Sequence, residues 1–198
     1  MKARSAARSG LTLVAALWPI AALAHQSGGE AIGFLGGLKH PVSGWDHVLA
    51  MVAVGLWGAQ LGAPAIWLLP VTFPMVMAFG GMLALLGVPL PGGEIGIALS
   101  AIALGGVVLA EARPPLPAAA LLVGFFAIFH GHAHGTELPP GANGLLYSVG
   151  FVIATGALHA TGIGIGLVHR WRAGAIALRV AGAVVAGAGV VFLWRALA

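Results

Sequence analysis

The sequence predicts an all-α polytopic membrane protein, because it is rich in apolar and small residues and poor in charge. Of 198 residues, 60% are hydrophobic and only 7% are charged, whereas soluble proteins carry about 25% charged residues. The mean hydropathy is +1.02. Glycine contributes 32 residues, and small residues allow helices to pack closely in lipid. We therefore expect a transmembrane helix bundle.

The charged residues and the absence of cysteine exclude several classes of function. The net charge is +4, but the cations are scattered, so no basic surface for nucleic acid is predicted. The chain has no cysteine, which excludes disulfides and thiolate metal sites. No nucleotide-binding motif is present. Any transport would therefore depend on ion gradients or on trapping of the cargo.

The N-terminus has the features of a cleavable secretory signal peptide. Basic residues precede a short apolar run, and residues 22–24 read ALA, an A-x-A cleavage signal. Cleavage after Ala24 would make residues 1–24 the signal peptide and His25 the mature N-terminus. There a free amine beside an imidazole could chelate a divalent cation. The alternative is an uncleaved first span, but the apolar run is shorter than the roughly 20 residues that a span requires.

Six apolar segments follow, and they are separated by proline, glycine or charged residues. We place them near 45–61, 65–86, 94–110, 116–134, 145–168 and 173–193. The short connections make neighbouring helices antiparallel, so residues 25–198 are predicted to form one six-span domain. With His25 outside, Arg113, Arg170 and Arg172 lie on the cytoplasmic side, as the positive-inside rule requires. The predicted location is a bacterial inner membrane, with the mature N-terminus in the periplasm.

Glycine and proline mark the expected packing sites. Four glycine pairs have the spacing that favours close helix contact. They are Gly58/Gly62, Gly92/Gly96, Gly131/Gly135 and Gly162/Gly166. Pro70 and Pro74 lie inside the second predicted span and should kink or open it locally. Such a helix could line a path for cargo, or it could only pack within the bundle.

Residues 129–137, FHGHAHGTE, end the fourth predicted span with three imidazoles and a carboxylate. At about 100° per residue on a helix, His130, His134 and Glu137 share one face, whereas His132 points nearly the opposite way. Ionisable groups at the edge of a span are costly and are usually functional. Histidine and glutamate are ligands for divalent transition metals. The alternative is a set of interfacial histidines bonded to headgroups and water.

A second cluster, HPVSGWDH at 40–47, opens the first predicted span. Pro41 suits a helix start, and a helical turn would place His40 and His47 on one face. Asp46 could bind metal directly, or orient His47 by accepting its other ring N–H, or only cap the helix. The first span begins and the fourth ends on the outer side, so the two clusters should meet at one membrane depth.

Three other polar residues are weaker candidates. His159 lies in the middle of a span, one turn after Thr155. It is a candidate for a deeper ligand, a proton acceptor or a hydrogen-bonded packing residue. His169 lies in a cytoplasmic loop and is expected to be only interfacial. Arg179 lies inside the last predicted span, and no role is assigned to it.

The two clusters resemble the motifs of the HupE/UreJ family of nickel permeases, membrane accessory proteins associated with hydrogenases and ureases. The family pattern H-P-x-x-G-x-D-H is complete at 40–47, and F-H-G-x-A-H-G-x-E is complete at 129–137. The length, the six spans and the signal peptide followed by His25 are also similar. The metal-handling residues that this resemblance implies are His40, Asp46, His47, His130, His134 and Glu137. His132 occupies a variable position of the second motif.

The resemblance and the residues together predict a secondary transporter for a divalent transition metal, with Ni²⁺ as the preferred cargo. It would import the ion from periplasm to cytoplasm for metalloenzyme maturation. In this hypothesis, His25 and His40 capture the ion, the other motif residues replace its water shell, and His159 helps to pass it inward. His132 is a further candidate ligand. Co²⁺, Zn²⁺ and Cu²⁺ remain alternative cargoes, because ligand type alone does not separate these metals.

The expected partners are the metal ion, the lipid bilayer and maturation factors of nickel enzymes. No prosthetic group is expected, and the sequence does not define an oligomeric state. Two alternatives from other functional classes stay open. One is an intramembrane metal-dependent hydrolase, in which zinc activates a water molecule. The other is a metal-sensing or metal-delivery subunit that binds the ion without flux.

Overall fold

The computed structural model describes residues 28–138 and 141–198, which form seven α-helices and two 3-10 helices. The α-helices are α2 (Gly28–Lys39), α3 (Trp45–Leu61), α4 (Ala65–Leu85), α5 (Gly93–Leu109), α6 (Leu116–Thr136), α7 (Gly144–Gly166) and α8 (Arg172–Leu197). The 3-10 helices are η1 (His40–Val42) and η2 (Leu167–Arg170). The predicted signal peptide and His25 lie outside the described residues.

Each of the six predicted apolar segments is a helix, with ends close to those expected. Within residues 28–138 and 141–198, four helical segments are able by length and composition to cross a membrane: α4, α6, α7 with η2, and α8. Helix α5 is a shorter apolar helix, and α3, like α5, has 17 residues. The chain is therefore a multi-pass helical membrane protein, and the count of six crossings stays a prediction.

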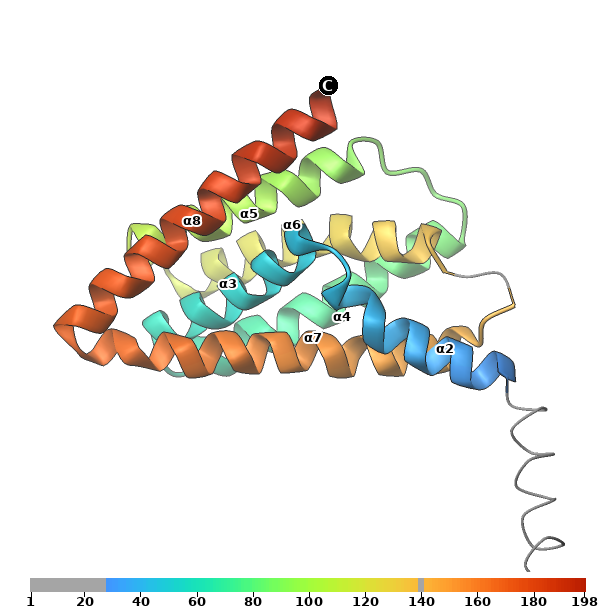
Figure 1. Cartoon of the computed structure of the whole chain (residues 1–198), viewed down its shortest axis with the longest axis horizontal. Helices are drawn as coiled ribbons and strands as arrows, with labels where there is room; N and C mark the ends of the chain where they lie inside the picture. Colours follow the sequence, from blue (N-terminus) through green and yellow to red (C-terminus); the bar gives the residue numbers. More distant parts are fainter. Residues whose placement is uncertain (1–27, 139–140) are drawn as a thin grey trace, which may run out of the picture.

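Helix α2 is an element that the sequence did not predict, because glycine costs about 1 kcal/mol in a helix relative to alanine. It lies along the first part of α7 (Figure 1). A Cβ atom at Gly37 would collide with the carbonyl oxygen of Tyr147. The missing side chain thus permits the packing that holds the helix in place. Helix α2 leads directly into η1 and so positions His40.

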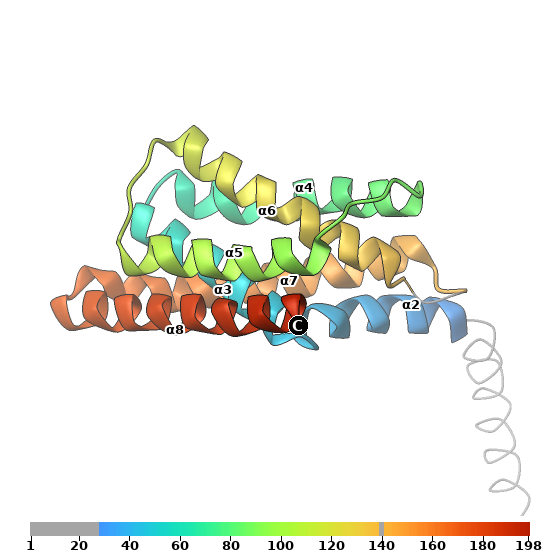
Figure 2. The same cartoon turned by 90° about the horizontal axis from the view of Figure 1, so that it is seen from above.

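The helix pairs with the most extensive contacts are not consecutive in the chain. Helix α4 packs on α6, α5 on α8, and α3 on α7 (Figures 1 and 2). Successive glycines of α6 contact successively later residues of α4, and those of α7 do the same along α3. Helices α4 and α6 are therefore parallel to each other, as are α3 and α7. Helix α3 contacts α4, α5, α7 and α8, and most of its residues are buried. It is the central helix of the bundle.

Two of the four predicted glycine pairs are sites of close helix contact. A Cβ atom at Gly131 would collide with the Met77 carbonyl oxygen on α4, and one at Gly162 would collide with the Val52 carbonyl oxygen on α3. Gly135 and Gly166 extend these contacts along the same interfaces. Backbones that approach so closely gain van der Waals contact, which favours helix association in lipid.

Each of the other two pairs contains one turn glycine, so the packing prediction was wrong for Gly62 and Gly92. Gly62 ends α3 with φ 79°, and Gly92 precedes α5 with φ 75°. Both positions are turns in the left-handed region that favours glycine. Gly58 lies at ordinary contact distance from Ala65, whereas a Cβ atom at Gly96 would collide with the phenyl ring of Phe129 on α6. The spacing alone does not distinguish a turn glycine from an interface glycine.

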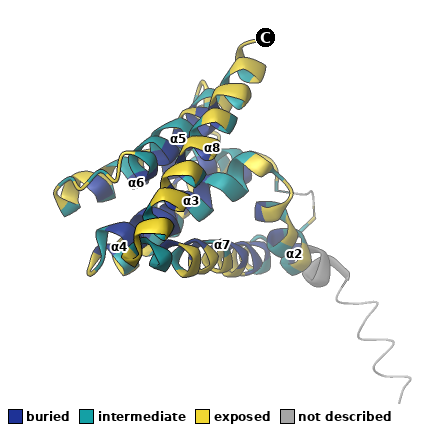
Figure 3. Cartoon of the chain, turned by 60° about the vertical axis from the view of Figure 1, so that its left-hand side comes forward, coloured by how far each residue is buried: buried dark blue, intermediate teal, exposed yellow. Residues whose placement is uncertain are grey.

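The outer faces of the bundle carry large apolar side chains. Trp67 on α4, Leu121 on α6 and Val184 on α8 are each at least 60% exposed, and the exposed residues lie along the outside of the helices (Figure 3). So much exposed apolar surface is unfavourable in water and suits a lipid environment. The surface therefore agrees with the polytopic class that the composition predicts.

Glycine packing between α3 and α7 gives a first prediction. We expect Gly162→Ala to destabilise the protein by about 1–3 kcal/mol, because the added methyl overpacks the interface. Gly156→Ala on the same helix is the matched control, since a Cβ atom there has nothing within 4 Å. It should be neutral or slightly stabilising. Thermal unfolding in detergent micelles measures the stability of the two variants. An equal loss of stability in Gly162→Ala and Gly156→Ala would contradict the interface.

Membrane topology gives a second prediction. Reporters fused after Arg113 and after Arg172 should indicate a cytoplasmic location. A reporter fused near Asn143 should indicate a periplasmic location. The reason is the distribution of basic residues among the loops. The opposite pattern would place the histidine clusters on the cytoplasmic side and remove the basis for capture from outside.

Candidate metal centre

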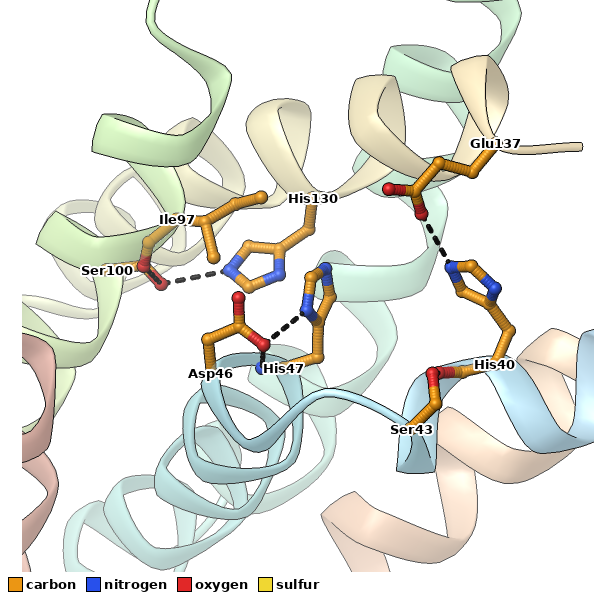
Figure 4. Close-up of polar contacts among 8 residues, drawn as sticks. All are labelled: His40, Ser43, Asp46, His47, Ile97, Ser100, His130 and Glu137. Carbon is orange, nitrogen blue, oxygen red and sulfur yellow. Dashed lines mark hydrogen bonds and ion pairs between the residues drawn. The ribbon is translucent and has the colours of Figure 1, made fainter. Parts of the chain in front are cut away.

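The two sequence motifs meet at one end of the bundle, as predicted from their positions in the chain (Figure 4). His40 lies on η1, and Asp46 and His47 lie in the first turn of α3. Helix α6 contributes His130 and His134, and Glu137 ends it. The imidazole rings form a contiguous group, with centroid distances of 4.8 Å from His47 to His130 and 4.5 Å from His47 to His134.

One group of possible ligands in the cluster consists of His40, His134 and Glu137. One ligand atom from each lies within 4.8 Å of the others. His40 Nε2 is 2.9 Å from Glu137 Oε2, and the His40 and His134 rings are 4.6 Å apart. His40, which is predicted to take part in capture of the ion, thus lies beside His134 and Glu137.

The chain between His40 and His47 is not one helical turn, so the two residues do not share a helix face. The Ser43 hydroxyl donates to the His40 carbonyl at 2.6 Å, and α3 begins only at Trp45. A Cβ atom at Gly44 would lie 2.6 Å from an Asp46 carboxylate oxygen. Glycine at this N-cap therefore leaves room for the Asp46 carboxylate to fold back over the helix end.

Asp46 orients the His47 imidazole. Its Oδ1 accepts the backbone N–H of His47 and lies 2.9 Å from His47 Nδ1. Because a carboxylate only accepts hydrogen bonds, Nδ1 carries the proton and Nε2 carries a lone pair. His47 Nε2 is buried and has no hydrogen-bond partner among the described residues. A metal-binding histidine typically donates one ring N–H to a carboxylate and binds the metal through the lone pair of the other ring nitrogen.

Ser100 on α5 defines the protonation of His130 in the same way. The Ser100 hydroxyl donates its only proton to the Ile97 carbonyl at 2.6 Å and lies 2.9 Å from His130 Nε2. Ser100 therefore accepts from His130, so Nε2 carries the proton and Nδ1 carries the lone pair. His130 is fully buried, and its Nδ1 has no partner in the described part of the chain.

His134 connects the cluster to a cavity of about 300 Å³ between α4, α6 and α7. Neither ring nitrogen of His134 has a hydrogen-bond partner among residues 28–138 and 141–198. The centroids of the His134 and Phe151 rings lie 4.3 Å apart. Pro74 and Met77 of α4 line the cavity, as does Tyr147 of α7. The proline-containing helix therefore borders the cavity beside the cluster.

Three other histidines lie apart from the cluster. His132 points away from it, as expected from the helix geometry, and its Nε2 lies 2.8 Å from the Val88 carbonyl oxygen. His169 Nδ1 lies 2.9 Å from the Gly166 carbonyl oxygen in the opposite end of the bundle. His159 is buried on α7 and shares no ring contact with the cluster, although it contacts Phe73.

Sequence reasoning missed Ser100, Tyr147 and Phe151. Ser100 is the only polar residue between 95 and 110, and a lone hydroxyl in an apolar span is a signal that could have been followed. The two aromatic residues have no such signal, because their role depends on how α7 packs against η1 and α6. The Tyr147 and Phe151 rings lie 5.9 Å and 6.4 Å from the His40 ring.

Several ring nitrogens of the cluster have no hydrogen-bond partner among the described residues. His47 Nε2, His130 Nδ1 and His134 offer imidazole nitrogen, and Glu137 offers carboxylate oxygen. Neutral imidazoles with a few carboxylates suit Ni²⁺, Co²⁺, Cu²⁺ and Zn²⁺ better than Mg²⁺ or Ca²⁺, which prefer oxygen ligands only. The donor set therefore fits a divalent transition metal.

The fold and this cluster define a multi-pass helical membrane protein with a histidine- and carboxylate-rich centre near one end. The chain belongs to the HupE/UreJ family, since the model described as "HupE / UreJ protein" matches residues 12–192. Protein HupE of Rhizobium leguminosarum bv. viciae is 48% identical over 182 residues, which are 92% of this chain and 95% of that protein. No solved structure matches the chain significantly.

The geometry predicts which histidines control metal affinity. We expect His134→Ala to weaken equilibrium Ni²⁺ binding by roughly tenfold or more, because it removes a buried ligand. His132→Ala should change it little, because that side chain faces the Val88 carbonyl. Affinity should fall below about pH 6, where protons compete for the imidazoles. Titration of the purified proteins with Ni²⁺ measures the affinity of each variant and the pH dependence of the wild type. Equal effects of the two variants would reject the site.

Proposed function

We propose that this chain is a permease that imports a divalent transition metal, with Ni²⁺ as the preferred cargo, from the periplasm into the cytoplasm. The imported ion would supply the maturation of a nickel enzyme in the bacterial cytoplasm. The observation that carries the proposal is the convergence of both motifs on one buried cluster. There His47 Nε2 and His130 Nδ1 are buried without a hydrogen-bond partner among the described residues, and the centroids of the two rings lie 4.8 Å apart.

The position of the charges supports entry from the outer side. The Glu137 and His40 side chains are 53% and 25% exposed, and His47 is 13% exposed, whereas His130 is fully buried. An incoming cation would first meet hydrated carboxylate and then buried neutral imidazole. Ligands of this kind exchange for water without the tight binding of thiolates, and transport requires release as well as binding.

The hydrolase alternative lacks a spare base in this arrangement. A metal-dependent hydrolase needs an open metal position for water and a carboxylate or similar group to take its proton. Asp46 is hydrogen-bonded to His47, and Glu137 is paired with His40. Both carboxylates of the cluster are paired with imidazoles, so water activation by either of them would require its pair to open.

The inner side of the cluster is closed by apolar side chains. Phe73 is fully buried, as is Leu69 one turn before it on α4, and the Phe73 ring lies 5.3 Å from the His130 ring. A continuous polar path to the cytoplasmic side is thus interrupted here. Inward transport would require a conformational change that displaces this apolar layer, as alternating access does in other transporters.

The transport proposal predicts the behaviour of four variants in liposomes. With external Ni²⁺ and a trapped chelating dye, His47→Ala, His130→Ala and Asp46→Asn should each abolish uptake, because they remove ligands or the group that orients His47. Membrane insertion should remain intact. His169→Ala is the matched control and should transport like the wild type, because it lies at the far end of the bundle.

Two outcomes would contradict the proposal. Strong Ni²⁺ binding without flux, in correctly oriented wild-type protein, would replace the permease with a sensor or delivery subunit. Unchanged uptake by His130→Ala would reject the cluster as the path of the ion. The same assay with Co²⁺, Zn²⁺ or Cu²⁺ in place of Ni²⁺ tests the choice of cargo.

A further inference from the structure

His159 and Thr155 form a second group of buried polar side chains, deeper in the bundle than the motif cluster. They are four residues apart on α7, so they share one helix face. His159 is 1% exposed and Thr155 is 0% exposed. Both ring nitrogens of His159 and the Thr155 hydroxyl lack a hydrogen-bond partner among the described residues. Buried polar groups usually have partners, so this pair requires an explanation.

Thr155 differs from the other hydroxyl residues of the same helix. Ser148 and Thr161 are exposed, and each donates to the carbonyl four residues before it, at 2.8 Å. That local bond is the usual solution for a hydroxyl within a helix in an apolar environment. Thr155 does not make it. Its hydroxyl therefore stays available to a ligand on the buried face of α7.

A backbone carbonyl of α4 completes the group. Pro70 and Pro74 lie inside α4, and a proline has no N–H to donate. The Pro70 carbonyl would normally accept from residue 74, so it lacks that helical partner. Helix α4 contacts α7, and the Pro70 carbonyl lies near the His159 ring without a hydrogen bond between them. The His159 imidazole, the Thr155 hydroxyl and the Pro70 carbonyl thus each have unused hydrogen-bonding capacity.

The Phe73 side chain lies between this inner group and the motif cluster. Its ring centroid is 5.3 Å from His130 and 5.5 Å from His159. The two imidazoles make no ring contact with each other in the described part of the chain. Phe73 is fully buried and lies on α4 between the two prolines. The aromatic ring is therefore the side chain that both imidazoles share.

We propose that His159, Thr155 and the Pro70 carbonyl form an inner site for the transported cation, and that Phe73 is the gate between it and the motif cluster. The inference rests on the proposed transport function and extends it. The inner site would take a partly dehydrated divalent transition metal through one nitrogen and two neutral oxygens. Without a carboxylate it binds the ion more weakly than the outer cluster, which favours onward release.

The inner site is tested by comparing two hydroxyl substitutions on one helix. Thr155→Val removes the buried hydroxyl and keeps the shape, whereas Thr161→Val removes an exposed hydroxyl that is already bonded to Ala157. In the liposome assay with Ni²⁺, we expect Thr155→Val to lower the initial flux by about fivefold. We expect His159→Ala to lower it by roughly tenfold or more. Thr161→Val should match the wild type.

Equilibrium Ni²⁺ binding separates the inner site from the outer cluster. All three variants should keep wild-type affinity, because the motif residues are intact. Wild-type flux in both Thr155→Val and His159→Ala would overturn the inner site and leave the permease proposal standing. Equal losses in Thr155→Val and Thr161→Val would also overturn it, as a packing effect. If His159→Ala does not fold, Thr155→Val decides. Absence of flux in the wild type would instead reject the permease.

The gate is tested with a single introduced thiol, because the chain has no cysteine of its own. In a Thr155→Cys variant, a small methanethiosulfonate reagent added from outside should react slowly, and Ni²⁺ should slow the reaction further. Adding Phe73→Ala should increase the rate by roughly tenfold, since it removes the buried ring. In a Thr161→Cys variant, neither Ni²⁺ nor Phe73→Ala should alter the reaction rate. Equal rates with and without Phe73→Ala would overturn the gate.

Discussion

Helices α4 and α6 approach so closely that a Cβ atom at Gly131 would collide with the Met77 carbonyl oxygen. On another side of α6, the Phe129 ring lies over Gly96 of α5. These two contacts determine the rotation and the height of α6, because lipid provides no hydrophobic force that would compensate for looser packing. His130 and His134 are thereby directed toward α3. The glycines of the second motif hold its ligands in place.

The possible ligands change from partly hydrated carboxylates near the surface to buried imidazoles deeper in the bundle. At the rim, Glu137 and Asp46 keep part of their hydration, with 53% and 26% of their side chains exposed. Deeper ligands are neutral imidazoles, and an isolated charge at that depth would be costly. The arrangement lets a cation exchange water for protein ligands in stages. It also explains why carboxylates are paired with histidine at the rim and are not found beside Phe73.

Helical periodicity was sufficient to predict much of the site, because the interval between His130, His134 and Glu137 is a local property of one helix. It also predicted that His132 points away. Contacts between helices were less predictable. The glycine-rich α2 has poor helix propensity and forms through packing on α7, so the position of His40 beside Glu137 could not be derived locally. The helix pairing, α4 with α6 and α3 with α7, likewise depends on the three-dimensional packing.

Helix α4 is the element that connects the cluster, the apolar layer and His159. Pro70 and Pro74 each remove one backbone hydrogen bond from it, so bending at this point costs less than in an intact helix. Its outer half borders the cavity beside His134, and Phe73 lies between the prolines. Helix α3, in contrast, is buried. Gln60 bonds it to α5, and Trp57 bonds it to Ala112 in the segment that follows α5. Movement of α4 against this fixed centre would displace Phe73 and leave His47 and Asp46 where they are.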